Sequence, residues 1–381
     1  MKIRIKHGNH GRRWDDDGMP PHRPTSHIAR STRRLGTTAL AAVAMLCGLD
    51  SVVQAESLET IDVGRGDVTL FTPDTVNEDE PKPLILWLHG FGGNSEQENY
   101  FDLRSRVDEL GFLLCTPDGT ADAANSQFWN ATDACCDLGN FQPDDSGYLR
   151  TLIETIISEH EVDLNRIHVT GYSNGGFMSH RMACDHADLI ASIASLAGVT
   201  HLDPTLCVPS EPVHVLQMHG TLDSTIEYGG GCFDGCHPSA IETVRRWAVE
   251  AECSLFPEFS RNIDIDAGVV GAETIVERYA ENCLEGGSSE LWTIVDGGHG
   301  PLLTDDFGDR VLEWLYAHPK MIEEPPCAAD LIEDGVVDGF DLSLLLAYWG
   351  QSGTIADLNQ DGSVSGPDLA IILAAWGDCG Q

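Results

Sequence analysis

Between about residues 60 and 318 the chain alternates short apolar runs with longer segments whose apolar residues recur at helical spacing. Several of the short runs are apolar at successive positions, as strands buried on both faces are. The pattern predicts an α/β fold, in which helices cover both faces of a mostly parallel sheet. The predicted strands are 68–73, 84–90, 112–119, 167–173, 191–199, 213–220 and 290–297, and the predicted helices are 100–110, 145–160, 176–186, 240–252 and 306–317.

This alternation stops before Pro325 and Pro326, and the chain beyond them repeats itself with an offset of 27 residues. "ADLIEDGVVDGFDLSLLLAYWG" begins at Ala329 and "ADLNQDGSVSGPDLAIILAAWG" begins at Ala356. Each repeat is an acidic loop followed by an apolar helix, which predicts a small all-α module with its own core. We therefore expect four parts: a leader and signal peptide at 1–55, an α/β domain at 56–321, a proline-containing linker at 322–327 and the repeat module at 328–381.

The first 55 residues have the pattern of an export signal. Arg33 and Arg34 precede an uncharged apolar stretch at 35–49, and Val53 and Ala55 then occupy the small-residue positions of a cleavage site. The stretch is too short to span a bilayer comfortably. The sequence therefore predicts a secreted protein without a membrane span.

The charge of the chain disfavours some classes of binding partner. Asp and Glu number 61 against 22 Lys and Arg, and nine of these basic residues lie in the first 55 positions. The rest of the chain is thus strongly acidic, which disfavours a binder of nucleic acid or of an anionic membrane surface.

The cysteines agree with export. The chain has twelve, and most of the eleven beyond Cys47 should pair in an oxidising compartment. Zinc binding is the alternative, but two CxxC-type pairs are lacking. From spacing we expect Cys232 with Cys236, Cys253 with Cys283, Cys327 with Cys379, pairing among Cys135, Cys136, Cys184 and Cys207, and a buried free thiol at Cys115.

"GYSNG" at 171–175 is the strongest candidate for a catalytic motif. It fits G-x-S-x-G, with an apolar strand before it and an amphipathic helix after it. In such a turn the serine is strained and exposed as a nucleophile, and Gly171 and Gly175 avoid steric clashes. The alternative is that Ser173 is an ordinary helix N-cap.

A serine nucleophile needs a general base and a group that orients the base. In this fold class the order along the chain is Ser, then Asp or Glu, then His. Asp223 follows the strand at 213–220, and His299 follows the strand at 290–297. The alternatives are that His299 is a plain loop histidine, or that a neighbouring acid such as Asp203, Glu227 or Asp234 takes the place of Asp223.

An oxyanion needs two preorganised N–H donors. We expect one from Asn174, directly after the serine, and one from Phe91 in "LWLHGFGGN", although this loop could also be a simple glycine turn. Phe91, Phe128 and Trp129 are candidates for a substrate pocket, with a place in the core as the alternative.

Seven motifs in series resemble the secreted polyhydroxybutyrate depolymerase and feruloyl-esterase-like α/β-hydrolases. They are "LILWLHGFGGN", "CTPDGT", "FWNATDACCD", "DDSGYLRTLIE", "GYSNGGFMSHRMACDHADLIASIASLAG", "VHVLQMHGTLD" and "GGHG", across 57–318. The resemblance implies a secreted serine esterase with the triad Ser173, Asp223 and His299. Its substrates would be feruloyl or acetyl esters on xylan-type plant polysaccharide, or alternatively a short-chain polyester. An alternative of another class is a non-catalytic surface protein that binds polysaccharide.

Two departures from that family leave the substrate open. The histidine motif continues as "GHGPL" instead of Thr-Trp-Pro, and Phe91 stands where a smaller residue or Cys is common. Both changes lie where the acyl or alcohol group of a substrate would sit.

The C-terminal loops have the ligand spacing of an EF-type calcium site, with oxygen ligands at positions 1, 3, 5, 7, 9 and 12 and Gly at 6. In the first loop Ile332 occupies position 3, so one ligand is missing; the alternative for either loop is an acidic turn without metal. The repeats resemble a type I dockerin, which implies calcium binding and docking to a cohesin-like partner, with cell-surface attachment equally open. The candidate ligands are Asp357, Asn359, Asp361, the Ser363 carbonyl, Ser365 through water, and Asp368 in the second loop, and Asp330, Asp334, Asp338 and Asp341 in the first.

Overall fold

The computed structural model describes residues 57–74, 80–232, 234–321, 327–332, 334–352, 354–359 and 362–378. The expected leader and signal peptide at 1–55 and residues 322–326 of the expected linker lie outside these ranges. Within the described ranges, no helix has both the length and the apolar character needed to cross a bilayer.

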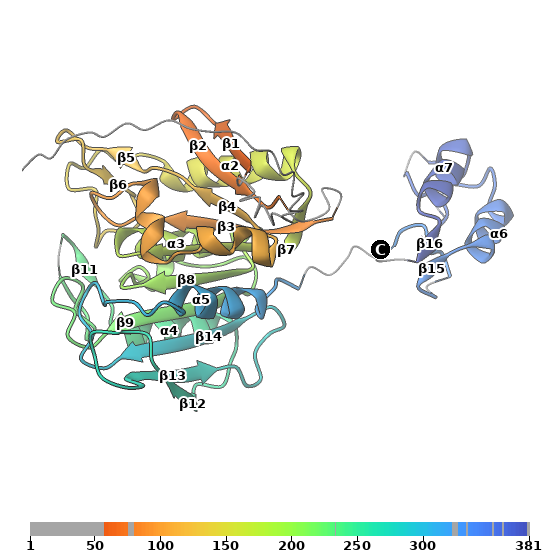
Figure 1. The fold of residues 1–381 in the computed structure, drawn as a ribbon. Helices are drawn as coiled ribbons and strands as arrows, with labels where there is room; N and C mark the ends of the chain where they lie inside the picture. Colours follow the sequence, from red (N-terminus) through yellow and green to blue (C-terminus); the bar gives the residue numbers. More distant parts are fainter. Residues whose placement is uncertain are drawn as a thin grey trace, which may run out of the picture. The chain divides into compact units, whose positions relative to one another are not determined.

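A ten-stranded sheet forms the centre of the larger domain (Figure 1). Its strand order is β1-β2-β4-β3-β7-β8-β9-β14-β13-β12. The strands from β4 to β14 in this order are parallel, and antiparallel strands complete both edges. The strands are β1 (Ser57–Asp62), β2 (Asp67–Thr72), β3 (Lys82–Leu88), β4 (Leu113–Thr116), β7 (Val162–Tyr172), β8 (Ser192–Leu196), β9 (His214–Gly220), β12 (Glu258–Ile263), β13 (Thr274–Tyr279) and β14 (Ser288–Ile294).

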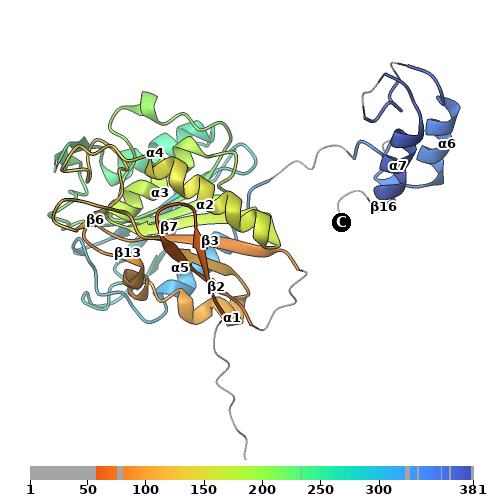
Figure 2. The ribbon, with the colours of Figure 1, turned by 90° about the horizontal axis from the view of Figure 1, so that it is seen from above.

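Helices cover both faces of this sheet, as Figure 2 shows from above. On one face lie α2 (Asp145–Glu159), α3 (Asn174–Asp185) and α4 (Ala240–Glu250), and on the other α1 (Val107–Leu110) and α5 (Phe307–Tyr316). Their apolar sides pack against strands that are buried throughout, such as β3 and β8. The predicted fold class, an α/β-hydrolase with a mostly parallel sheet, is therefore confirmed.

Each of the seven predicted strands is present, but the edges and one helix differ from the prediction. The sequence analysis missed β1, β12 and β13, which pair antiparallel and carry polar residues on their exposed faces. The predicted helix at 100–110 is broken into η1 (Ser95–Tyr100), η2 (Arg104–Arg106) and α1. Asp102, with a φ of 56°, interrupts the right-handed helical path, and Gly111, with a φ of 70°, ends α1.

The disulfide pairing agrees with the spacing argument. The bonds are Cys135–Cys136, Cys184–Cys207, Cys232–Cys236 and Cys253–Cys283. Cys115 is a buried free thiol, and burial raises its pKa. Cys327 is disulfide-bonded, whereas Cys379 lies outside the described residues.

The repeat module has a core of its own. It contains α6 (Gly339–Ala347), α7 (Gly366–Ala374) and the short antiparallel pair β15 (Val336–Val337) and β16 (Gly377–Asp378). Its buried residues are Ala329, Val337, Leu345, Ala356, Val364 and Ile372. They form three pairs separated by the repeat offset, so the two halves contribute equivalent side chains to one core.

Two histidines on the sheet, the buried His168 and the partly buried His214, should make the fold sensitive to acid. His168 Nδ1 lies 2.7 Å from Ser192 Oγ, and His214 Nδ1 lies 2.7 Å from Ser288 Oγ. Burial lowers the pKa of each imidazole to about 3. Both histidines are therefore neutral in the folded protein well below the pH at which the unfolded chain takes up their protons.

We predict that the free energy of unfolding falls between pH 7 and pH 5. The unfolded state binds protons near the ordinary histidine pKa of about 6.5 and the folded state does not, which costs about 2 kcal/mol for each of these two histidines over this interval. Urea unfolding at both pH values would measure the loss in the parent and in His168→Gln. The variant should lose about 2 kcal/mol less than the parent; an equal loss would contradict the assignment to His168.

Candidate active site

Ser173 occupies the corner between β7 and α3. Its φ of 53° and ψ of −116° are strained for a residue with a side chain. Its N–H donates to Leu196 O at 2.8 Å, and its carbonyl accepts from Phe177 N at 3.0 Å. The Ser173 side chain makes no capping hydrogen bond to α3. Ser173 is therefore held as in a nucleophile elbow and does not act as a side-chain N-cap.

The glycines on either side of Ser173 are required by close backbone approach. A Cβ on Gly175 would lie 2.0 Å from Leu88 O, and a Cβ on Gly171 would lie 2.6 Å from Gly175 C and O. Neither glycine has a positive φ. Their role is thus to let α3 start directly against the end of β3.

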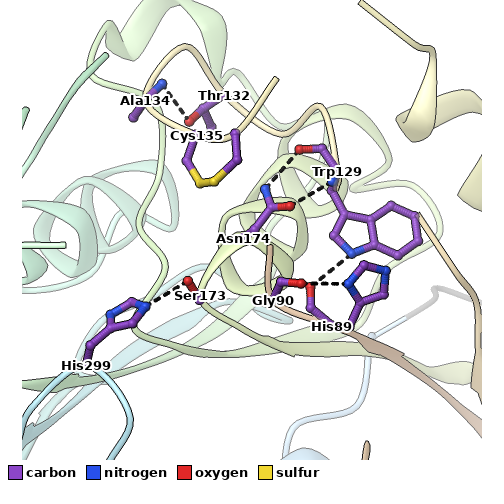
Figure 3. Close-up of a disulfide and its surroundings, with 10 residues drawn as sticks. His89, Gly90, Trp129, Thr132, Ala134, Cys135, Ser173, Asn174 and His299 are labelled. Carbon is purple, nitrogen blue, oxygen red and sulfur yellow. Dashed lines mark hydrogen bonds between the residues drawn. A yellow bond between two sulfur atoms is a disulfide. The ribbon is translucent and has the colours of Figure 1, made fainter. Parts of the chain in front are cut away.

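Ser173, His299 and Asp223 are brought together into one hydrogen-bonded chain. His299 Nε2 lies 2.8 Å from Ser173 Oγ, and His299 Nδ1 lies 2.7 Å from Asp223 Oδ2. Figure 3 shows His299 facing Ser173. The three residues follow β7, β14 and β9, whose carboxyl ends lie at the same edge of the parallel sheet. With the proton on Nδ1, His299 donates to Asp223 and accepts from the serine hydroxyl.

Asp223 is built to remain ionised. Its Oδ1 accepts from the N–H groups of Thr225 at 2.8 Å and Ile226 at 2.9 Å. Its Oδ2 faces His299 and also His219 Nε2, at 3.3 Å. Burial alone would raise the pKa of Asp223, but the hydrogen bonds from His219, His299 and Ile226 outweigh burial and hold the pKa well below its ordinary value.

The loop after β3 presents the second expected oxyanion donor. Gly90 O accepts from His89 Nδ1 at 2.7 Å and from Gly93 N at 3.0 Å, while Gly90 N donates to Gln97 Oε1 at 2.7 Å. These bonds fix the trans peptide between Gly90 and Phe91, so its N–H points away from the side chain of His89.

The N–H groups of Phe91 and Asn174 both lack an acceptor within the described parts of the chain, although Asn174 as a whole is 0% exposed. Asn174 is also the first residue of α3, where the helix dipole favours negative charge. The two donors that the sequence suggested are thus free in the structure.

Phe128 and Trp129 require a correction, because the structure places both out of reach of a substrate. Phe128 is 1% exposed and Trp129 is 0% exposed. Trp129 Nε1 donates to His89 O at 3.1 Å, and the Trp129 backbone exchanges hydrogen bonds of 2.7 and 2.9 Å with the Asn174 side chain (Figure 3). Trp129 therefore joins the loop after β3 to the start of α3.

The sequence analysis missed an aromatic residue beside the triad. The ring of Tyr172 lies 5.3 Å from that of His299 and 5.1 Å from that of Tyr100. Tyr172 is partly exposed, and burial of the rest of the side chain raises its pKa to about 12, so it is neutral. Phe91 is 40% exposed. The residue that precedes the nucleophile could have been singled out from its position alone.

A cavity of about 370 Å³ lies elsewhere in the domain. Thr200, His201 and Pro204 line it from the loop after β8, and Trp247 lines it from α4. None of the three triad residues lines this cavity. It is therefore separate from the reacting serine.

In the C-terminal module the expected calcium ligands lie in two similar loops. Asp330 accepts from Asp334 N at 3.1 Å and from Gly335 N at 2.7 Å, and Asp357 accepts from Gly362 N at 3.1 Å. The other carboxylate oxygen of Asp357, Oδ1, is buried and has no partner among the described residues. An orphaned carboxylate oxygen in an all-oxygen loop fits a hard cation such as calcium.

The aspartates at position 12 of both loops bind backbone N–H groups. Asp341 accepts from Leu331 N and Asp368 from Leu358 N, both at 2.8 Å. Burial raises the pKa of each carboxyl group, but the backbone donors outweigh burial and keep both pKa values low. Asp361 lies outside the described residues, and in the described part of the chain no three acidic, His or Cys side chains are grouped as a metal site.

Comparison with known proteins gives a family for the C-terminal module. Residues 328–375 match the model of the dockerin type I domain. Domains of this family generally bind calcium.

The larger domain is similar to esterases. A putative esterase, NocK, from Nocardia uniformis subsp. tsuyamanensis is 31% identical over 40% of this chain and 43% of its own length. Feruloyl esterase B from Piromyces equi is 28% identical over 64% of this chain and 43% of its own length. The chain thus spans less than half the length of each of these curated relatives.

The solved structure of an acetyl xylan esterase from Aspergillus awamori aligns with a TM-score of 0.49 at 15% identity, over 68% of this chain and 99% of that chain. Because that TM-score is below 0.5, the fold assignment rests on the strand order described above. Residues 328–375 are a dockerin type I domain, and the α/β-hydrolase domain that precedes it is similar in sequence to esterases.

Proposed function

We propose that the larger domain is a secreted serine carboxylic-ester hydrolase. The observation that carries this proposal is the hydrogen-bonded chain from Ser173 through His299 to Asp223. A hydroxyl at a strained corner, a base at 2.8 Å and a buried carboxylate that orients the base are the parts that acyl transfer requires.

The reaction would proceed through an acyl-enzyme. Ser173 Oγ attacks the ester carbonyl carbon while His299 Nε2 takes the hydroxyl proton, and the Asp223 carboxylate stabilises the imidazolium. The N–H groups of Phe91 and Asn174 hold the oxyanion. His299 then protonates the leaving alcohol as its bond to carbon breaks. A water molecule, deprotonated by His299, hydrolyses the acyl-serine, and the free acid leaves as Ser173 regains its proton.

The substrate class we favour is a feruloyl or acetyl ester on xylan-type polysaccharide. Relatives are named feruloyl esterase, and one is named a bifunctional acetylxylan esterase/xylanase. The partly exposed rings of Tyr172 and Phe91 offer aromatic surfaces to a feruloyl group. A polyester depolymerase is the alternative enzyme. The assembled triad geometry weighs against a protein that merely binds polysaccharide.

For the dockerin domain we propose calcium binding and docking. Asp357, Asn359, Asp361, Ser363 and Asp368 would hold the ion in the second loop, and bound calcium would neutralise the clustered carboxylates. Asp330, Asp334, Asp338 and Asp341 would form a weaker site, because Ile332 replaces a ligand. The partner would be a cohesin-like domain or a cell-surface protein, and the disulfides are consistent with an extracellular location.

Ser173→Ala should lower the rate of p-nitrophenyl acetate hydrolysis by at least about 10⁴-fold, because the attacking oxygen is lost. Ser158→Ala, which changes an exposed serine on α2, is the matched control and should retain the parental rate. A fluorophosphonate should label the parent and the control but not Ser173→Ala. Parental activity in Ser173→Ala would refute the proposed nucleophile.

Tyr172→Leu should raise KM for methyl ferulate by roughly two- to tenfold and change KM for p-nitrophenyl acetate less, because an aromatic contact contributes about 0.5–1.5 kcal/mol. Steady-state kinetics on both esters would measure the difference. Parallel assays on acetylated xylan and polyhydroxybutyrate separate the substrate classes. An equal change in KM for both small esters would remove Tyr172 from ferulate recognition.

Calorimetric titration of the full-length, chelator-treated protein with calcium should show a tighter and a weaker site. Asp357→Ala should abolish the tighter site and Asp330→Ala the weaker one, since each removes a position-1 ligand. Hydrolysis of p-nitrophenyl acetate should be unchanged by the chelator, because both loops lie outside the hydrolase domain. Unaltered titrations in both variants would contradict these sites.

A further inference from the structure

A chain of buried polar side chains leads from helix α4 to the triad carboxylate. Trp247 Nε1 lies 3.0 Å from His180 Nδ1, and His180 Nε2 lies 2.8 Å from Gln217 Oε1. Gln217 Nε2 lies 3.3 Å from His219 Nδ1, and His219 Nε2 lies 3.3 Å from Asp223 Oδ2. Each of the five side chains is at most 4% exposed.

The donor and the acceptor of each hydrogen bond in this series follow from the chemistry of the side chains. The indole N–H of Trp247 can only donate, so His180 Nδ1 must accept. Burial lowers the pKa of His180 to about 4, so His180 is neutral and its single proton is on Nε2, where it is donated to Gln217.

The tautomer of His219 follows from its hydrogen bond with Gln217. Since Gln217 Oε1 accepts from His180, the amide nitrogen of Gln217 faces His219 and can only donate. His219 Nδ1 must therefore accept, which leaves the proton of His219 on Nε2. This proton is donated to Ile226 O at 2.8 Å, and Asp223 Oδ2 is a second, more distant acceptor at 3.3 Å from the same nitrogen.

We propose that His219 is a positioning residue for the ester hydrolysis: the proton on its Nε2, shared between Ile226 O and Asp223 Oδ2, stabilises the Asp223 carboxylate, in a tautomer imposed by Trp247, His180 and Gln217. This inference rests on the proposed function, in which Asp223 orients the catalytic base. Oδ2 is the oxygen that His299 also binds, at 2.7 Å. His219 and His299 therefore contact the same oxygen, so His219 helps to fix the carboxylate relative to His299.

Loss of this donor should change the protonation of the Asp223–His299 pair. A hydrogen bond to a carboxylate favours its charged form, so removing the bond raises the proton affinity of the pair. A further titratable group near Asp223 is Tyr172, which stays neutral because burial raises its pKa to about 12. The acid limb of the pH–rate profile should therefore move to higher pH.

The test compares His219→Gln with His219→Met. A glutamine amide can reach the position of Nε2 and donate to Asp223, whereas methionine has a similar volume and no donor. We expect His219→Met to lower kcat for p-nitrophenyl acetate by about 10- to 100-fold, with KM within about twofold and the acid limb shifted upward. His219→Gln should recover most of kcat and the parental acid limb.

His214→Asn is the structural control, because His214 is also a histidine of β9 but is partly buried and belongs to a different hydrogen-bonded pair. It should lower stability without moving the pH–rate profile. Equal kcat and equal pH profiles for His219→Met and the parent would overturn the proposal. So would an equal loss in His219→Met and His219→Gln, since the donor would then be irrelevant.

A second readout separates this proposal from the proposed activity. Nitrogen-15 NMR of labelled histidines, read against the His219→Gln spectrum, reports which ring nitrogen of His219 carries the proton. A proton on Nε2 supports the relay, and a proton on Nδ1 overturns it, whatever the activity. Absence of Ser173-dependent hydrolysis in the parent would defeat the ester-hydrolase proposal instead.

Discussion

The close approach of α3 to the end of β3 is the constraint on which the candidate site depends. The backbone of Gly175 contacts Leu88 so closely that no side chain fits between them. This contact forces the chain through the strained conformation at Ser173 and starts the helix at Asn174. It also places the free N–H of Asn174 next to the loop that continues from Leu88. One backbone contact thus places the hydroxyl of Ser173 and the N–H of Asn174 beside that loop.

Buried polar networks then hold the groups that surround this point. His89 and Gln97 fix the peptide between Gly90 and Phe91, and Trp129 joins the loop of His89 to Asn174. On the other side, Asp223 receives hydrogen bonds from its own turn and from two histidines. Because an unsatisfied polar group is costly in the interior, such networks have few alternative arrangements. The geometry of the site is therefore determined largely by the buried hydrogen bonds around it.

The dockerin domain is held together differently from the hydrolase domain. Its core is small and is built from three pairs of repeat-related side chains. Such a module buries little apolar surface, so backbone hydrogen bonds to Asp341 and Asp368 organise much of each loop. The hydrolase domain has a large core and a prebuilt site, whereas the loops of the dockerin domain concentrate carboxylates that a bound cation would neutralise.

The sequence by itself determined the fold class, the position of the elbow serine and the Cys232–Cys236 and Cys253–Cys283 pairs. These features depend on local pattern: apolar periodicity, glycine spacing and the spacing of cysteines. It also indicated Asp223 and His299 by their order along the chain. The antiparallel edge strands were not evident, because a strand with one exposed face lacks a continuous apolar run.

The environments of side chains that contact distant segments were decided only by the tertiary structure. Trp129 carries an indole that suggested a substrate pocket, yet folding buries it against His89 and Asn174. Tyr172 is brought beside His299, and Trp247 is connected through His180, Gln217 and His219 to Asp223. Sequence patterns report which face of an element is apolar. The partner of a buried polar group is set by the packing of several elements together, and that information is absent from any single segment.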